Sequence, residues 1–162
     1  MNNIIFLDID GVLNDMDYFR KSKDVRHNYY KCLTGYKKLL LTHLLDIDLN
    51  KVYLLKELIN NTNSKVVVTS SWRNLRIYPL VEDYLINLGI PIIDTTPYID
   101  SKRGLEIKTY LEEHEVSNYI ILDDDIFPDF DEEILIHLIH TSFFYGGLTD
   151  EHVYEGIYRL RR

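Results

Sequence analysis

Aspartate pairs stand where two apolar segments of the chain end. Asp8 and Asp10 follow the segment that begins at Ile4, and Asp123 and Asp124 follow Tyr119–Leu122. A carboxylate can attack phosphorus and divide a hydrolysis into two displacements, but its charge repels a phosphate unless a cation intervenes. Mg²⁺ prefers the hard oxygen ligands that such carboxylates supply. The residue types are therefore compatible with magnesium-assisted chemistry on a phosphate.

A third polar strand end accompanies the two acidic ones. The apolar run KVVVT ends at Thr69 and is followed by Ser70. In open α/β sheets ligands bind outside the carboxyl ends of the strands, so three separate regions of sequence would converge at one place. Packing gives no reason to gather carboxylates that repel one another, which favours a functional site over ordinary turns.

The elements that must position these residues alternate between strands and helices, the pattern of an α/β fold with a mainly parallel sheet. We predict strands at Ile4–Ile9, Lys65–Thr69, Tyr119–Leu122 and Ile134–His140, with a shorter one at Ile90–Ile93. Apolar periodicity predicts helices at Val52–Asn60, Ile77–Leu88 and Leu105–His114, and a last one at Asp150–Leu160 with Thr149 as its N-cap.

The segment 15–49 departs from this pattern. It is rich in Tyr, Lys and Asn, its periodicity is weak, and it is too long for an ordinary loop. We interpret it as a small cap-like insertion at the mouth of the site, with short helical pieces around Tyr36–Leu45. Its basic residues predict either a solvated face or a cover for an anionic substrate, and they are Lys21, Lys23, Arg26, Lys31, Lys37 and Lys38.

Composition limits the class of protein. The 162 residues suit one domain, 1–162, and 46% apolar with 27% charged residues is typical of a globular chain. The formal charge of −8 disfavours non-specific binding to nucleic acid. No apolar run reaches the roughly 20 residues of a membrane span and no signal peptide is visible, so we expect no membrane association. The single cysteine, Cys32, fits a reducing cytoplasmic location and is expected to be a buried, inert thiol.

The motifs together resemble the haloacid dehalogenase (HAD) superfamily of phosphohydrolases. DIDGV at residues 8–12 is similar to its first motif, VVVTS at 66–70 to its second and ILDDD at 121–125 to its fourth. The third motif, a Lys or Arg ahead of a helix, is matched by either Lys102 or Arg103. TSSWR, RGLEI, LDDD and GLT also look like the small HAD domains found alone or attached to RNA-repair proteins. The resemblance covers nearly all of the chain outside 15–49.

The resemblance implies a three-layer Rossmann-like fold without a large cap domain, and roles for the site residues. Asp8 would be the nucleophile and Asp10 the general acid and base. Thr69 or Ser70, with Lys102 or Arg103, would bind the substrate phosphate. A Mg²⁺ cofactor would be held by the four carboxylates of Asp8, Asp10, Asp123 and Asp124. The expected substrate is a phosphomonoester: first a nucleic-acid end or nucleotide, second a small phosphorylated metabolite.

Two other functions fit parts of the pattern. A phosphoacceptor signalling domain also combines a parallel sheet, an acidic metal site and a phosphorylated Asp, but it has a lone acceptor, whereas here Asp10 follows Asp8 by two residues. A catalytically silent phosphate-binding domain is disfavoured because every expected catalytic residue type is present.

Several other residues can be interpreted either as functional or as purely structural. Trp72 could stack on a base and Arg73 bind a phosphate, but a Trp at the core edge and an Arg opening a helix are more common. Asp129 could support the metal site, although a solvated acidic loop is favoured. His137 and His140 are expected to be structural, since a spacing of three in a strand places them on opposite faces.

Overall fold

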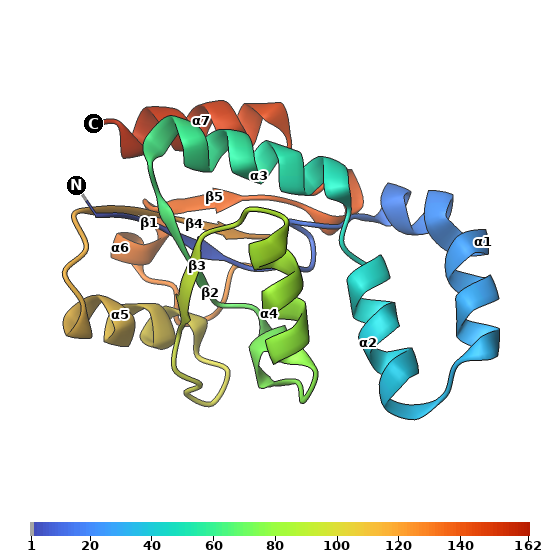
Figure 1. Cartoon of the computed structure of the whole chain (residues 1–162). Coiled ribbons are helices and arrows are strands. Elements are labelled where there is room, and N and C mark those ends of the chain that lie inside the picture. The colour runs from blue at the N-terminus through green and yellow to red at the C-terminus, as the bar shows by residue number, and fades with distance from the viewer. Residues whose placement is uncertain (1) are drawn as a thin grey trace.

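The computed structural model describes residues 2–162 and contains one five-stranded sheet, all of whose strands are parallel (Figure 1). The strand order is β3-β2-β1-β4-β5, with β1 in the centre. The strands are β1 (Asn3–Leu7), β2 (Lys65–Val68), β3 (Ile92–Thr95), β4 (Asn118–Asp123) and β5 (Leu138–His140). The predicted α/β class and parallel sheet are confirmed.

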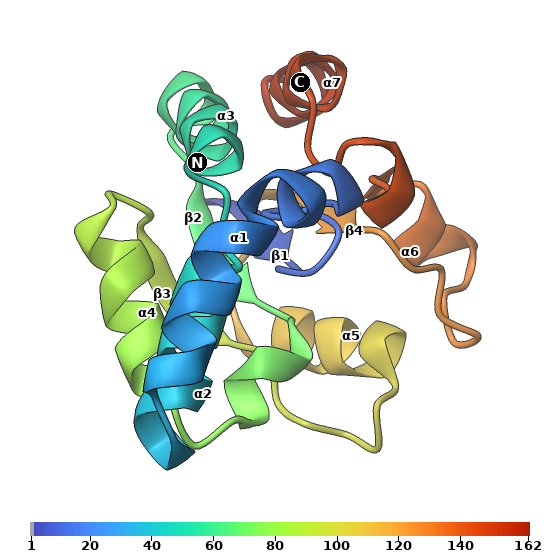
Figure 2. The same cartoon turned by 90° about the vertical axis from the view of Figure 1, so that its right-hand side faces the viewer.

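Helices cover both faces of the sheet and form the outer layers (Figure 2). The longer helices are α1 (Met16–Cys32), α2 (Gly35–Leu45), α3 (Leu49–Thr62), α4 (Tyr78–Asn87), α5 (Arg103–Glu113) and α7 (Asp150–Leu160). A short helix, α6 (Glu132–Leu135), and two 3₁₀ turns, η1 (Ser71–Asn74) and η2 (Phe143–Tyr145), complete the elements. The helices predicted from periodicity are present, and Thr149 caps α7 as expected, accepting a hydrogen bond from the His152 N–H.

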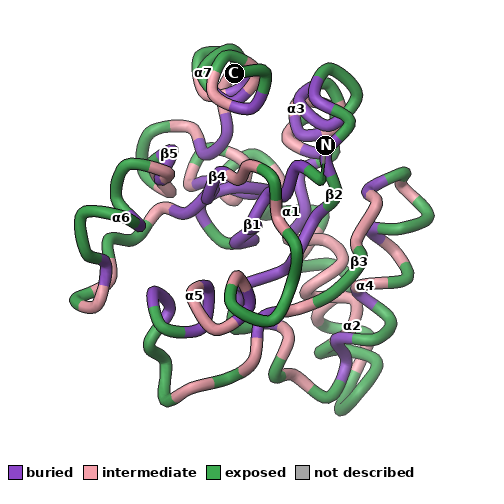
Figure 3. The backbone as a smooth tube through the Cα atoms, turned by 90° about the vertical axis from the view of Figure 1, so that its left-hand side faces the viewer, coloured by how far each residue is buried: buried purple, intermediate pink, exposed green. Residues whose placement is uncertain are grey.

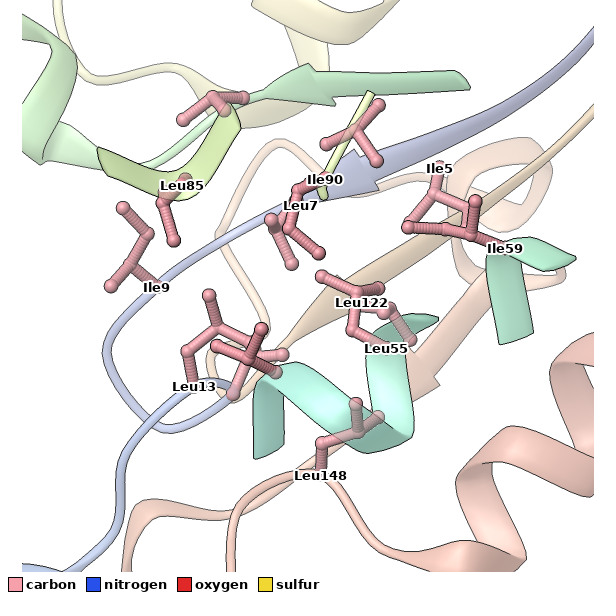
Figure 4. Close-up of a cluster of buried hydrophobic side chains, with 14 of the residues drawn as sticks. Ile5, Leu7, Ile9, Leu13, Leu55, Ile59, Leu85, Ile90, Leu122 and Leu148 are labelled. Carbon is pink, nitrogen blue, oxygen red and sulfur yellow. The ribbon is translucent and has the colours of Figure 1, made fainter. Parts of the chain in front are cut away.

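The core has two parts because β1 is buried on both faces. On one face Ile5, Leu7 and Ile9 pack with side chains of α3, α4 and α7, including Leu55 and Leu85 (Figure 4). On the other face Ile4 and Phe6 pack against α5, α6 and the loop between β4 and α6. Because successive side chains of β1 point to opposite faces, the strand contributes to both parts of the core. A shift of one residue would exchange the two sets of side chains, so packing on both faces fixes the register of β1.

Two predicted strands are wrong in part. Ile134–His140 divides into the end of α6 and the three-residue strand β5, because the Asp131 carboxylate accepts a hydrogen bond from the Ile134 N–H and starts a helical turn. The predicted strand Ile90–Ile93 is shifted and runs instead from Ile92 to Thr95. Pro91 has no N–H to donate, so the strand begins after it.

The segment 15–49 is a helical hairpin of α1 and α2 that extends beyond the carboxyl edge of the sheet (Figure 1). The expected helical piece at 36–45 is confirmed as α2, but the 17-residue α1 was not expected. Its start is set by Asp15, whose carboxylate accepts from the Tyr18 N–H at 2.9 Å. Within residues 2–162, neither α1 nor α2 contains a buried residue. The central strands, by contrast, are buried (Figure 3). Cys32, expected to be buried, is exposed at the end of α1.

Among the helices described, none combines the length and the apolar character that crossing a bilayer requires.

Candidate active site

Three carboxylates meet at the carboxyl edge of the sheet. Asp8 directly follows β1, Asp123 ends β4 and Asp124 comes next, and each offers an oxygen within 4.8 Å of the others. The backbone pairing that brings them together continues past β1, where the Asp8 N–H donates to the Leu122 carbonyl at 2.9 Å. The Asp123 carbonyl in turn accepts from the Thr141 N–H at 3.0 Å.

Gly11 allows the first loop to approach Asp124. Its φ of +69° lies in the left-handed region that favours glycine. A Cβ at this position would lie 2.1 Å from the Asp124 Cγ. Any side chain would therefore strain the backbone and displace a carboxylate of the site.

The carboxylates resist ionisation because they are buried beside one another. Burial, with the Asp8 charge as a second cause, raises the pKa of Asp123 to about 8, although Arg103 opposes the shift. Burial and the Asp8 charge also raise the pKa of Asp124 to about 6. The pKa of Asp8 is raised as well, again chiefly by burial. Like charges held close disfavour the ionised forms, and a cation would remove that penalty.

Arg103, rather than Lys102, reaches the cluster. One Arg103 Nη lies 2.6 Å from Asp123 Oδ2, 3.2 Å from Thr69 Oγ1 and 3.6 Å from Asp8 Oδ1. The guanidinium also packs over the Phe127 ring, 4.6 Å from its centroid. Arg103 is the first residue of α5 and is buried, whereas Lys102 is the exposed residue before it. The structure therefore places one of the two candidate cations at the site.

The two hydroxyl candidates at the end of β2 differ in their contacts. Thr69 is buried and its Oγ1 accepts the Arg103 hydrogen bond, while its N–H donates to the Leu7 carbonyl. The Ser70 Oγ accepts from the Trp72 N–H at 3.4 Å and lies against Asp8, where it partly opposes the burial that raises the pKa of Asp8. Both hydroxyls stand next to the carboxylates, so both remain candidates for contact with a phosphate.

Asp10 is held apart from the three carboxylates. Its Oδ2 accepts from the Trp72 indole N–H at 2.8 Å and its Oδ1 from the Asn14 amide at 2.9 Å. Asp8 is buried and Asp10 exposed, and both line the same cleft. Within residues 2–162, the carboxylate group that could hold a metal does not include Asp10. Trp72 is buried and thus belongs to the core edge, the commoner of its two expected roles.

The cleft over these residues has a volume of about 350 Å³. Besides the carboxylates and Arg103, it is lined by the polar residues Ser71, Arg73, Asn74, Ser101, Glu106 and Asp125 and by the aromatic residues Tyr98, Phe127 and Phe143. It therefore combines a charged floor with aromatic walls, which suits a phosphate that is attached to a larger group.

A buried ion pair under the cleft was not expected from sequence. Arg73 Nη2 lies 2.6 Å from Glu106 Oε2, and Arg73 also donates to backbone carbonyls of Thr69, Ser70 and Thr96. Glu106 accepts in addition from the Ile99 N–H at 2.9 Å. Arg73 thus ties the end of β2 to α5. The sequence held one signal for Glu106, the partner of Arg73: it lies one helical turn after the candidate residue Arg103.

Three further residues take supporting positions. Asn14 is fully buried, and its Oδ1 accepts from the Gly11 N–H at 2.9 Å. The Thr141 Oγ1 donates to the Gly11 carbonyl at 2.8 Å. Asp129 accepts from the Leu105 N–H at 2.9 Å, so it caps the start of α5. Thr141, the polar residue that follows β5, carries the same sequence signal as the polar residues at the other strand ends.

The donor set fits a hard divalent cation. Three carboxylates supply oxygen ligands, their raised pKa values show mutual repulsion, and Mg²⁺ takes such ligands together with water. Asp8, Asp123 and Asp124 would hold the ion.

Comparison with known families gives one match. Residues 4–153 match the family described as the HAD domain in Swiss Army Knife RNA repair proteins. The chain belongs to this family. The matched part contains β2 to β5, all of β1 except Asn3, all eight predicted site residues and the α1–α2 hairpin. HAD domains are hydrolases that generally depend on Mg²⁺, in agreement with the aspartate cluster. Comparison with curated proteins and with solved structures found no match.

Proposed function

We propose that this HAD domain is a magnesium-dependent phosphatase that hydrolyses a phosphomonoester through an aspartyl-phosphate on Asp8. The observation that carries the proposal is the arrangement of two separate acids. Asp8 lies in the cation-binding cluster beside Arg103, while Asp10 lines the same cleft and is held by Trp72 and Asn14.

In the first displacement an Asp8 carboxylate oxygen forms a bond to phosphorus as the bond from phosphorus to the leaving oxygen breaks. Asp10 donates its proton to that leaving oxygen, which departs as an alcohol. Arg103 and the Thr69 hydroxyl, 3.2 Å apart, contact the phosphoryl oxygens and stabilise their charge.

In the second displacement a water oxygen bonds to phosphorus and the bond from phosphorus to Asp8 breaks. Asp10, now ionised, takes the proton of that water. Inorganic phosphate leaves and both acids return to their starting states. A bound Mg²⁺ supplies charge neutralisation between the nucleophile and the phosphate. Asp8, Asp123 and Asp124 would hold it.

The substrate class follows from the walls of the cleft and from the family. Tyr98, Phe127 and Phe143 can contact a base or sugar attached to the phosphate. The matched family is described from RNA repair proteins. These two observations support a phosphorylated nucleic-acid end or nucleotide ahead of a small phosphorylated metabolite. Arg103 is buried at the floor of the cleft, which suits contact with a terminal phosphate.

A phosphatase screen tests the proposal. Nucleotides, sugar phosphates, phosphopeptides and oligonucleotides with a 5′ or 3′ phosphate are incubated with the protein in Mg²⁺ or in EDTA. We expect release of phosphate only with Mg²⁺, fastest from a nucleotide or an oligonucleotide end. Full activity of metal-free protein would contradict the mechanism. A phosphorylated Asp8 that accumulates without turnover would favour a phosphoacceptor domain instead.

A further inference from the structure

We propose that the α1–α2 hairpin is a nucleic-acid-binding arm that carries a single strand away from the catalytic cleft along α1. The inference rests on the proposed function only for the phosphate end that enters the cleft. The binding of the strand itself is a separate property.

The hairpin and the rest of the chain carry net charges of opposite sign. Residues 16–45 contain seven Lys and Arg against two Asp, a formal charge of +5. The remaining residues contain 11 Lys and Arg against 24 Asp and Glu, a formal charge of −13. A polyanion would therefore be repelled by the sheet and its covering helices and attracted to the hairpin. This division removes the objection that the overall charge of −8 raises against nucleic acid.

Aromatic rings connect the cleft to α1. Phe143 lines the catalytic cleft, and its ring centroid lies 5.5 Å from that of Phe19 on α1. Phe144 lies 5.5 Å from Phe143 and is 71% exposed, and Tyr145 beside it is 87% exposed. Large exposed aromatic side chains at the mouth of a cleft can stack on bases, because every base has a π-face.

Beyond Phe19 a basic stripe continues along the helix. A shallow groove of about 150 Å³ is lined by Phe19, Lys23, Arg26, His27 and Tyr30. Lys23, His27 and Lys31 follow Phe19 at intervals of four residues, so they share one face of α1. Lys23 and Lys31 are exposed and enter none of the ion pairs in the described part of the chain. Both are free to contact phosphates.

The combination of features favours a single nucleic-acid strand over a phosphopeptide. Alternating rings and lysines match the alternating bases and phosphates of a strand, and α1 is about 25 Å long, enough for several nucleotides. A phosphopeptide would need pockets for its side chains, whereas the groove on α1 is shallow.

Arg26 has a structural role in this arm. It forms an ion pair with Asp46, packs over Phe19 at 4.0 Å and donates to the Tyr30 hydroxyl at 3.0 Å. It thereby fastens α1 to the segment that follows α2. Substitutions that test binding must spare it, since their effect would otherwise be one on folding.

The experiment measures binding of a fluorescein-labelled single-stranded oligonucleotide of about 12 nucleotides without a terminal phosphate, so hydrolysis plays no part. We expect Lys23→Gln/Lys31→Gln to weaken binding about tenfold at low salt and to lower the slope of log Kd against log salt by about two. Phe144→Ala/Tyr145→Ala should weaken binding about fivefold or more, with an unchanged salt slope.

The control Lys56→Gln/Lys65→Gln makes the same change of charge on the acidic part of the chain and should retain the wild-type Kd within twofold. Lys21→Gln, on the opposite face of α1 from Lys23, should also have little effect. Equal losses for the Lys56/Lys65 control would overturn the proposal, as would a Kd for the oligonucleotide no lower than that for a phosphopeptide of equal charge. Loss of oligonucleotide binding leaves the phosphatase screen unaffected, so the two proposals fail separately.

Discussion

The sheet and the α1–α2 hairpin are stabilised by different interactions. Every residue of β1 is buried, and the strand is covered on both faces. In the part of the chain that the structure describes, α1 and α2 contain no buried residue. Leu40 and Leu44 of α2 pack against the core while only partly buried, and polar and aromatic contacts supply further attachment. Among these, the Tyr18 hydroxyl donates to the Leu45 carbonyl at 2.6 Å and His43 packs against Trp72 at 4.5 Å.

The difference separates two tasks. A charge-bearing site that performs displacement needs atoms fixed to within a fraction of an ångström, which a close-packed sheet supplies. A surface that contacts varied substrates needs exposed side chains, and these add little to stability. Changes in the two regions should therefore differ in kind, and four experiments compare them.

The largest effect is expected at the nucleophile. Asp8→Asn should lower turnover by roughly a thousandfold or more, because an amide cannot take the place of the attacking carboxylate. The matched variant Asp17→Asn alters an exposed aspartate of the hairpin and should retain the wild-type rate. Phosphate release is measured with both proteins at equal Mg²⁺. Substantial turnover by a well-folded Asp8→Asn protein would remove Asp8 from the mechanism.

The next largest effect is expected from a change in core packing. Leu55→Ala in α3 removes a fully buried side chain and should lower the free energy of unfolding by about 3 kcal/mol. Val25→Ala in α1, where the side chain is 54% exposed, should change it by less than about 0.5 kcal/mol. Urea denaturation with a common slope compares them. Equal losses would show that the hairpin is part of the cooperative core.

Trp72 lies where the two regions meet. Trp72→Phe keeps a ring but removes the N–H that binds Asp10, and should lower kcat for a poor leaving group by roughly 10- to 100-fold. An activated aryl phosphate, which needs less protonation of its leaving group, should be affected less.

His43→Leu is the companion variant from the hairpin side. It removes the ring that packs against Trp72 but leaves the Trp72–Asp10 hydrogen bond in place. We expect a change in kcat below about threefold. Equal effects of His43→Leu and Trp72→Phe would mean that ring packing, and not the N–H donor, controls Asp10.

The smallest expected effect is the pH dependence of the free energy of unfolding. Asp123, with a pKa of about 8, and Asp124, with a pKa of about 6, both exceed the usual 3.8. The folded protein then binds more protons than the unfolded chain between about pH 4 and 8, so stability without metal should fall as pH rises through that range. Mg²⁺ binds the ionised forms, so it should raise Tm more at pH 8 than at pH 5.

Asp46 provides the comparison from the hairpin side. Burial raises its pKa to about 6, and it pairs with Arg26 away from the carboxylate cluster. The part of the pH dependence that Mg²⁺ does not remove should therefore include Asp46, while His152, whose pKa is lowered by burial, acts in the opposite direction. Differential scanning calorimetry across this pH range, with EDTA and with Mg²⁺, separates the contribution of the carboxylate cluster from the remainder. A metal-free Tm that rises steadily from pH 5 to pH 8 would contradict the raised pKa values.

The sheet could be predicted because its signals are local. Short apolar runs that end in Asp, Thr or Ser determine both the strands and the edge at which their polar residues meet. Helix α1 gave no such signal, since its residues are mostly polar and none of them is buried. Ile134–His140 is apolar throughout, and the capping carboxylate of Asp131 decides which part of it becomes helix.

The site could be predicted to the level of residue type. The sequence placed both Lys102 and Arg103 ahead of a helix, and only the start of α5 at Arg103 decides which side chain faces the strand ends. The bond from Trp72 to Asp10 spans 62 positions and depends on the turn η1, so no local pattern indicates it. Glu106 was missed for the same reason, since tertiary structure brings Arg73 to it across 33 positions. Asn14 was missed although its partners Asp10 and Gly11 are local, because its hydrogen bonds depend on the fold of the loop after β1.

Cys32 is a natural site for attaching a spectroscopic label to the hairpin. It is the only thiol of the chain, it is exposed, and it stands at the end of α1 far from the sheet (Figure 1). A maleimide dye would therefore label one defined position at the tip of the hairpin, with no need to remove other cysteines. The native chain can report by energy transfer to a labelled oligonucleotide which end of the strand lies at the cleft and which lies at the tip.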